Sequence, residues 1–321
     1  MTSHRRHDRL GIHSIGEFHM TVPSLDEARR FYTAFGLDVQ PDGERGLLIR
    51  TFGSPHVWGR LREGARKKFD WLTLHCFADD LDALRSRAIA AGVETIAPPS
   101  DANSDSDSDS NSSGFWIRNP DGVPLQIRPG VKTTLDEASH TSPPLPVDGT
   151  RCAPYRRVTQ QVRPTRLSHI AFATASVPAQ IDFCERVLGL RLSDRSGDGV
   201  AFIHAPHGGD HHLFAMAMSS GPALHHLSWD VPTVEEVGLG SMQMAAAGYK
   251  NGWGLGRHVL GSNYFYYVQD PWGSFSEFSA TLDYIPASVD WVAQDHAPED
   301  SMYLWGPDLP PIFFANSEHG A

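Results

Sequence analysis

The sequence predicts an α+β fold of four βαβββ modules that pair into two half-barrel domains. Two segments share one order of elements: FHMTVPSLDEARRFYTAFGLDV, from Phe18, and SHIAFATASVPAQIDFCERVLGLRL, from Ser168. Each begins with strand-like alternation and continues as an amphipathic helix, which ends at Gly36 in one segment and near Gly189 in the other. The chain is therefore an internal repeat of about half its length.

The end of each half has a second shared pattern. GFWIRNPDGVPLQI, from Gly114, and YFYYVQDPWGSFSEF, from Tyr264, both place a Pro-x-Gly turn between two strand-like runs. Proline fixes φ and glycine accepts positive φ, so the pattern predicts β-hairpins. A weaker order of strand, helix and glycine near Phe69 and near His225 brings the units to four. Strands outnumber helices in such units, which favours curved sheets around a pocket.

Composition shifts predict where the domains end. We expect an N-terminal domain at 1–135, a linker at 136–164 that contains TSPPLPVDGT, a C-terminal domain at 165–285 and a tail at 286–321. The tail, rich in proline and aromatic residues, either covers the pocket mouth or packs outside the barrel or on another subunit. Residues 100–114, SDANSDSDSDSNSSG, are acidic and of low complexity, which predicts a solvated loop rather than a calcium site.

Composition and charge exclude several classes of partner. The 27 basic and 38 acidic residues give a formal net charge of −11, which disfavours nucleic acid and anionic membranes. The three cysteines, Cys76, Cys152 and Cys184, lack CxxC spacing, so we expect no disulfide framework and a reducing, cytoplasmic location. The N-terminus has no apolar run of the length that a signal peptide or membrane span needs.

Three residues with metal-binding side chains lie in strand-like runs of the second half: His169 in RLSHIAFAT, His226 in ALHHLSWDV and Glu277 in GSFSEFSA. A lone histidine on a strand is more often a hydrogen-bonded core residue, and a lone glutamate usually faces water. All three, however, occupy corresponding places in the repeated units, and a buried carboxylate needs a partner or a cation. Two imidazoles and one carboxylate are the facial triad of non-haem Fe(II), which leaves coordination positions open.

The sequence resembles the type I extradiol ring-cleavage dioxygenases of the vicinal oxygen chelate superfamily, especially the 2,3-dihydroxybiphenyl and catechol 2,3-dioxygenase group. The resemblance covers nearly the whole chain. Its most specific part is GRHVLGSNYFYYVQDPWGSFSE, similar to the family pattern of Gly-x-His, a spacer, an apolar residue and Tyr, Asp-Pro-x-Gly and a closing Glu. Tyr266 departs from it, because an aliphatic residue or Phe usually precedes that tyrosine.

The resemblance implies an enzyme that opens a catechol ring by extradiol (meta) cleavage, with O2 and Fe(II), in the catabolism of aromatic compounds. The product would be a muconic semialdehyde or a related compound, and Mn(II) is the alternative metal. The family's metal ligands fall on His169, His226 and Glu277. Its other partners would be a small catecholic substrate and, in a homo-oligomer, further copies of the chain.

The resemblance also assigns residues around the metal. His212 in GGDHHLFAMA would be the acid/base histidine, chosen over His211 on alignment alone. His258 and Tyr267 would hydrogen-bond the substrate. The alternatives are a turn pair for the two adjacent histidines, a loop position for His258 and a core position for Tyr267.

The first half lacks the metal-binding set. Matching the repeats places Trp71 at the position of His226 and Gln126 at that of Glu277, and leaves His19 as the one remaining ligand type. One ligand cannot hold a metal. We therefore expect the domain at 1–135 to be metal-free and the domain at 165–285 to be catalytic.

Two other functions compete with this interpretation. A metal-dependent isomerase or lyase of the same fold would use two glutamate ligands more often than two histidines and one glutamate. A non-catalytic module that binds a small aromatic compound would have lost the triad, which this sequence retains.

Overall fold

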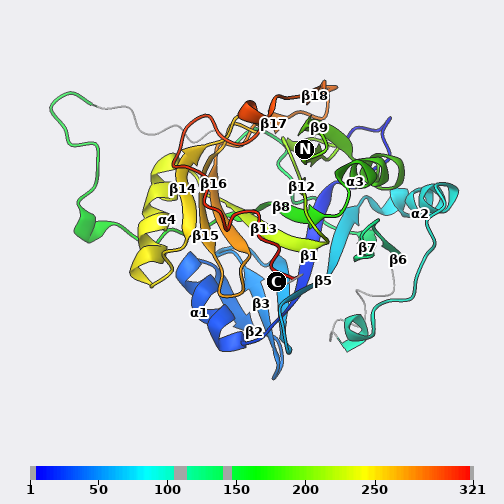
Figure 1. Cartoon of the computed structure of the whole chain (residues 1–321), viewed down its shortest axis with the longest axis horizontal. Coiled ribbons are helices and arrows are strands. Elements are labelled where there is room, and N and C mark those ends of the chain that lie inside the picture. The colour runs from blue at the N-terminus through cyan, green and yellow to red at the C-terminus, as the bar shows by residue number, and fades with distance from the viewer. Residues whose placement is uncertain (1–4, 105–113, 140–146, 319–321) are drawn as a thin grey trace.

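The computed structural model describes residues 5–104, 114–139 and 147–318, and its core is two large β-sheets, one from each half of the chain (Figure 1). The first sheet has the order β2-β3-β4-β1-β5-β7-β6. Its two units meet at the antiparallel pair β1–β5. Its elements are β1 (Ser14–Val22), α1 (Leu25–Phe35), β2 (Asp38–Pro41), β3 (Gly46–Arg50), β4 (Val57–Glu63), β5 (Lys68–Cys76), α2 (Leu81–Ala90), β6 (Phe115–Arg118) and β7 (Pro124–Pro129).

The second sheet repeats this plan, in the order β14-β15-β16-β13-β8-β12-β10-β9-β18, and its units meet at the antiparallel pair β8–β13. Its third unit consists of β8 (Arg166–Thr174), α3 (Val177–Phe183), β9 (Arg191–Ser196), β10 (Val200–His204), β11 (Gly209–Asp210) and β12 (Phe214–Met218). The fourth consists of β13 (Ala223–Asp230), α4 (Val234–Ala246), β14 (Gly252–Arg257), β15 (Tyr264–Gln269) and β16 (Phe275–Ala280). Strand β17 (Tyr284–Ile285) pairs with β11 just before the tail begins, and the tail adds β18 (Gln294–Asp295), which pairs with β9.

The α+β fold of repeated units is confirmed, with one difference in the second unit. Where the fourth unit has strand β14, the described residues of the second unit form only an isolated bridge between Ile96 and Trp116. Pro98 and Pro99 follow that bridge, and proline cannot donate to a strand ladder. A short 3-10 turn then spans Ser100–Ser104, and the rest of the acidic run, 105–113, lies outside the described residues.

The helix ends predicted from the repeats are confirmed, and the structure also shows how the helices begin. Ser24 and Ser176 are the N-caps of α1 and α3, and each side chain accepts a hydrogen bond from a backbone amide of the first turn. The helical segments end at Gly36, with φ 98°, and at Gly189, with φ 70°. A residue with a Cβ is strained at such angles, so glycine fixes both ends.

The two halves share one continuous core. Phe35 at the end of α1 stacks on Phe278 of β16, with ring centroids 3.8 Å apart, and Phe31 meets Tyr249 edge-on at 5.0 Å. Helices α1 and α4 therefore lie side by side, as Figure 1 shows, although they come from different halves. Buried apolar side chains of both sheets belong to the same cluster. This packing holds the second sheet against the first.

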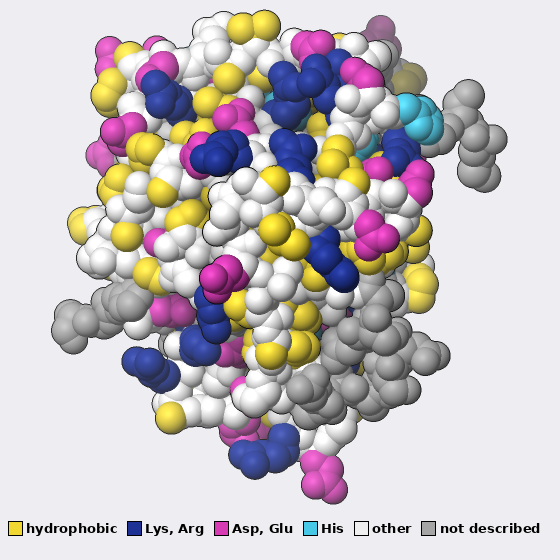
Figure 2. All heavy atoms as spheres, turned by 90° about the vertical axis from the view of Figure 1, so that its right-hand side faces the viewer, with side chains coloured by type: hydrophobic (Ala, Val, Ile, Leu, Met, Phe, Trp, Pro, Cys, Tyr) yellow, Lys and Arg dark blue, Asp and Glu magenta, His cyan; other side chains and the backbone are white. Residues whose placement is uncertain are grey.

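Within the described ranges, no helix has both the length and the apolar character needed to cross a bilayer. On the face in Figure 2, basic and acidic side chains are interspersed with exposed apolar ones.

Strand register shows which residues of the first half correspond to the three candidate ligands. Across β8, β13 and β16 the residues in register are His169, Ser228 and Glu277; across β1, β5 and β7 they are Glu17, Thr73 and Gln126. The counterpart of His169 is therefore Glu17, and the expectation of His19 was wrong. The error is two residues, which leaves the side chain on the same face of a strand.

A buried ion pair occupies this region of the first half. Arg60 of β4 bonds to Glu17 through Nε and to Asp42 through Nη1, the latter at 2.9 Å. His19 lies with Nε2 3.4 Å from the Glu17 carboxylate, and its ring stacks on Trp71. The guanidinium supplies the positive charge that the Glu17 carboxylate needs. That the first domain holds no metal stays a prediction.

Arg60→Met should destabilise the protein by about 3–5 kcal/mol, because it removes the guanidinium that pairs with the buried Glu17 carboxylate. The measurement is the free energy of unfolding from urea titration. The matched control is Arg30→Met, since the Arg30 side chain is 65% exposed and its nearest acidic group is 4.0 Å away. Adding Glu17→Gln to Arg60→Met should recover part of the loss. If the exposed variant is equally destabilised, the burial argument is wrong.

Candidate metal centre

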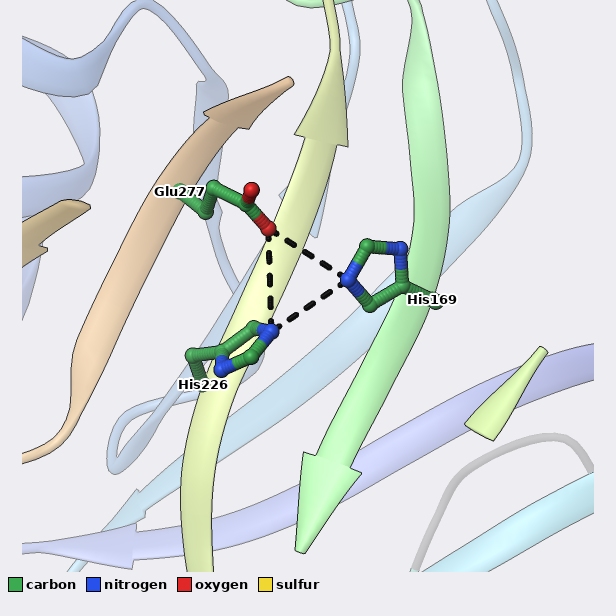
Figure 3. Close-up of side chains that lie close together, drawn as sticks. All are labelled: His169, His226 and Glu277. Carbon is green, nitrogen blue, oxygen red and sulfur yellow. Dashed lines mark hydrogen bonds and ion pairs between the residues drawn. The ribbon is translucent and has the colours of Figure 1, made fainter. Parts of the chain in front are cut away.

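The structure brings His169, His226 and Glu277 together (Figure 3). The Nε2 atoms of His169 and His226 are 3.2 Å apart. Glu277 Oε2 lies 3.3 Å from His169 Nε2 and 3.6 Å from His226 Nε2. All three side chains are buried. Within the described part of the chain, this is the one group of three such residues whose ligand atoms lie within 4.8 Å of one another.

Sheet register explains why they meet. The residues come from three neighbouring strands, β8, β13 and β16, and His169 and Glu277 both lie opposite Ser228 of the central strand. His226 is two residues before Ser228, so it faces the same side of the sheet. The small serine leaves the space above it to the larger side chains. His169 is oriented by Ser168, whose hydroxyl lies 3.0 Å from Nδ1, which leaves Nε2 for the centre.

The electrostatics fit a carboxylate at Glu277 and a neutral imidazole at His226. Burial would raise the pKa of Glu277, but the interaction with His169 and the charges of His169 and His258 outweigh it and hold the pKa below its usual value. For His226, burial and then the neighbouring histidines lower the pKa well below its usual range. Metal binding requires these protonation states, a deprotonated glutamate and a neutral histidine.

The donor set fits a divalent transition metal. Glu277 Oε2 is buried, and no described residue gives it a well-aligned hydrogen bond. A buried carboxylate oxygen in that situation is costly unless a cation is bound. Two imidazole nitrogens and one carboxylate oxygen suit iron or manganese and leave positions free for other ligands.

A cavity opens over His169 and His226, and its empty volume, open solvent included, is about 560 Å³. Its walls are mainly apolar and aromatic. Besides the two candidate ligands His169 and His226, it is lined by Ala171, Val200, Phe202, His212, Ala215, Met216, Ala217, His225, His258, Leu260, Asn263, Tyr267, Ser301, Met302, Phe313 and Phe314.

The three further residues assigned from the sequence all line this cavity. The ring of His212 lies 4.1 Å from that of His169, and His258 Nε2 is 3.0 Å from the Tyr267 hydroxyl. Burial, followed by nearby histidines, lowers the pKa of His212 well below its usual range. Burial, followed by Glu277, raises the pKa of Tyr267 well above its usual value, so the phenol keeps its proton and can donate.

The sequence analysis missed Asn263. Its side-chain amide donates to Glu277 Oε1 at 3.2 Å and to the Ser279 hydroxyl at 2.9 Å, so it orients the carboxylate. It is 1% exposed and lines the cavity. A buried asparagine two residues after Gly261 is not distinguishable from a loop residue without the tertiary contacts.

The tail runs across the front of the second sheet to Glu318 (Figure 1). Met302 and Phe313 line the cavity, and the Met302 carbonyl accepts a hydrogen bond from His258 Nδ1. Glu318 accepts from the backbone amides of Phe69 and Leu224, which fixes the end of the tail on both sheets. The tail is therefore part of the cavity wall.

Comparison with known proteins gives concordant matches. Residues 166–278 match the model of the glyoxalase/bleomycin resistance protein/dioxygenase superfamily. Metapyrocatechase 2 of Cupriavidus necator is 46% identical over 310 residues, which is 97% of this chain and 94% of that protein.

Solved structures share the fold at low identity. A Mn(II)-bound glyoxalase from Novosphingobium aromaticivorans superposes with a TM-score of 0.73 at 23% identity, covering 94% of each chain. An extradiol ring-cleaving dioxygenase from Brevibacterium fuscum has a TM-score of 0.74 at 20% identity, covering 96% of this chain and 83% of its own.

Proposed function

Because this chain belongs to the glyoxalase/bleomycin resistance protein/dioxygenase superfamily, and to the family of metapyrocatechase 2 within it, we propose that it cleaves a catechol with O2 by the extradiol route. The observation that carries the proposal is the cluster of His169, His226 and Glu277 beside a cavity with mainly apolar and aromatic walls. The product would be a muconic semialdehyde or a related ring-opened acid.

Fe(II) is the metal that we propose for His169, His226 and Glu277. Bound there, it would supply adjacent open positions at which a catechol and O2 can be held together. Mn(II) suits the same donors and is the alternative. A cytoplasmic location and a homo-oligomeric state stay predictions.

Tyr267 and His258 are placed to orient the substrate. The hydrogen bond between the Tyr267 hydroxyl and His258 Nε2 fixes both side chains at the cavity wall. Because the Met302 carbonyl accepts the His258 Nδ1 proton, a neutral His258 accepts at Nε2 from the Tyr267 hydroxyl, and the phenol oxygen can in turn accept a hydrogen bond from a substrate hydroxyl. The backbone carbonyl of Met302 accepts a hydrogen bond from His258 Nδ1, which restricts rotation of the imidazole.

His212 is placed to hold and return a proton during ring opening. Its ring lines the cavity beside His169, and it belongs to no ligand group. A neutral imidazole next to a bound catechol can accept a hydroxyl proton and later give it to a substrate oxygen. The aromatic rings of Phe313 and Phe202 restrict water around this exchange.

The proposal is tested by loading the purified, metal-free protein with Fe(II) or Mn(II) without oxygen and then adding a panel of catechols in air. We expect oxygen uptake together with a yellow ring-opened product. A catechol methylated on one oxygen is the substrate control and should give neither signal. Oxygen uptake without a coloured product, or conversion of a glutathione hemithioacetal in place of catechol, would contradict extradiol cleavage.

A further inference from the structure

Two pairs of adjacent histidines at the cavity are hydrogen-bonded in the same way. His211 Nδ1 lies 3.1 Å from His212 Nδ1, and His225 Nδ1 lies 2.7 Å from His226 Nδ1. A bond between two such nitrogens needs a proton on one and a lone pair on the other. The tautomers within each pair are therefore coupled.

The first member of each pair is anchored by its other nitrogen. His211 Nε2 lies 2.8 Å from Asp194 Oδ2, and His225 Nε2 lies 2.7 Å from the backbone carbonyl of Phe313. Burial would raise the pKa of Asp194, but hydrogen bonds from His211 and His296 hold it below its usual value, so the carboxylate is ionised. A carboxylate and a carbonyl can only accept. Both first histidines must carry a proton on Nε2, and in a neutral imidazole Nδ1 is then the acceptor.

The direction of the hydrogen bond within each pair determines the tautomer of the second histidine. We propose that His211 and His225 are positioning residues that force His212 and His226 to carry their proton on Nδ1. The Nε2 lone pair of His226 then points at Nε2 of His169 and Oε2 of Glu277, where the metal would lie. For His212, Nε2 is the nitrogen left for a substrate proton. The role of His212 rests on the proposed function, whereas the tautomers do not.

A hydrogen bond in the opposite direction, from His225 Nδ1–H to His226 Nδ1, is chemically unfavourable. A second proton on His225 would make Nδ1 a donor and would force His226 to present Nε2–H, which cannot bind a metal. It would also place a cation beside the metal ion. A histidine in water populates both tautomers. The hydrogen bond with His225 therefore excludes the Nε2–H tautomer of His226, which cannot bind a metal, before a metal ion binds.

The fold supplies the geometry that the pairs need. Successive side chains of a regular strand point to opposite faces, which would separate His225 from His226. The pairing of β13 with β8 skips one residue between Leu224 and His226, so His225 is the extra residue of a β-bulge. A bulge re-aims a side chain, and here both rings reach the same cavity. His211 is held by its backbone amide, which donates to the Asp283 carbonyl.

The direct test is 15N NMR of the full-length chain labelled at histidine, in the metal-free form and loaded with diamagnetic Zn²⁺. The shifts of the two ring nitrogens report which one carries the proton. We expect His212 and His226 as Nδ1–H tautomers, and His211 and His225 as Nε2–H tautomers, in the metal-free protein. Nε2–H at His226 or His212, or a mixture of tautomers, would overturn the proposal.

Matched variants separate positioning from packing. Phenylalanine keeps the ring volume and removes both nitrogens, whereas glutamine keeps one donor and one acceptor. His225→Phe should weaken Zn²⁺ binding by roughly 10- to 100-fold, and His225→Gln should restore part of it. His211→Phe should leave Zn²⁺ affinity unchanged and release the tautomer of His212, and His211→Gln should restrain it again. Equal Zn²⁺ affinity in His225→Phe and the unmodified protein would contradict the role of His225.

These readouts are independent of ring cleavage. If the tautomers are as stated and no catechol is cleaved, the proposed function is wrong and the positioning role stands. If catechol is cleaved and His226 carries its proton on Nε2 in the metal-free protein, the positioning role is wrong and the function stands.

Discussion

Replacing His226 by alanine should leave the protein unable to retain Fe(II), and ring cleavage should be lost with the metal. The side chain is one of three buried ligand-type groups, and its Nε2 is within 3.6 Å of both other ligand atoms. The remaining histidine and glutamate cannot complete the facial set. We expect a loss of affinity far beyond the roughly 10- to 100-fold that removal of an outer contact costs. Metal content after gel filtration, and titration of the metal-free protein with Fe(II), measure it.

His204→Ala is the matched control for this prediction. His204 is also a buried strand histidine, 2% exposed, and its Nδ1 is 2.8 Å from the Ser193 hydroxyl. It belongs neither to the ligand group nor to the cavity wall. The control variant should keep its metal even if it is less stable. Comparable metal loss in the two variants would mean that the effect arises from the fold and not from ligation.

Replacing His212 by alanine should have the opposite pattern, with metal retained and turnover reduced by roughly 100- to 10,000-fold. The imidazole touches the ring of His169 but is not part of the ligand group. Without it, the ring nitrogen that we propose as the proton acceptor beside His169 is missing from the cavity.

Metal content, substrate affinity and kcat must be measured on the same preparation of that variant. We expect a fall in kcat with little change in the binding of the catechol, since Tyr267 and His258 remain. Loss of metal equal to that of His226→Ala would refute the separate roles of the two histidines. Undiminished kcat would refute the proton-transfer role.

Local pattern was enough to predict much of this protein. The helix ends at Gly36 and Gly189 follow from short-range rules, because a cap and a positive φ involve only a few neighbouring residues. The grouping of His169, His226 and Glu277 was also within reach of the sequence. A polar residue of ligand type within an apolar strand is unusual by itself, and the repeat shows that the strands carrying it are equivalent.

Only the tertiary structure decided how those strands and the tail fit together. The counterpart of His169 in the first half is Glu17, because register can slip by two residues without changing the face on which a side chain lies. The cavity contacts of Asn263 and Phe313, and the coupling of His225 to His226 through a bulge, join residues that no local period connects. The periodicity of the sequence indicates which face of a strand is buried. Which side chain a residue contacts across the cavity depends on long-range packing, and periodicity does not indicate that.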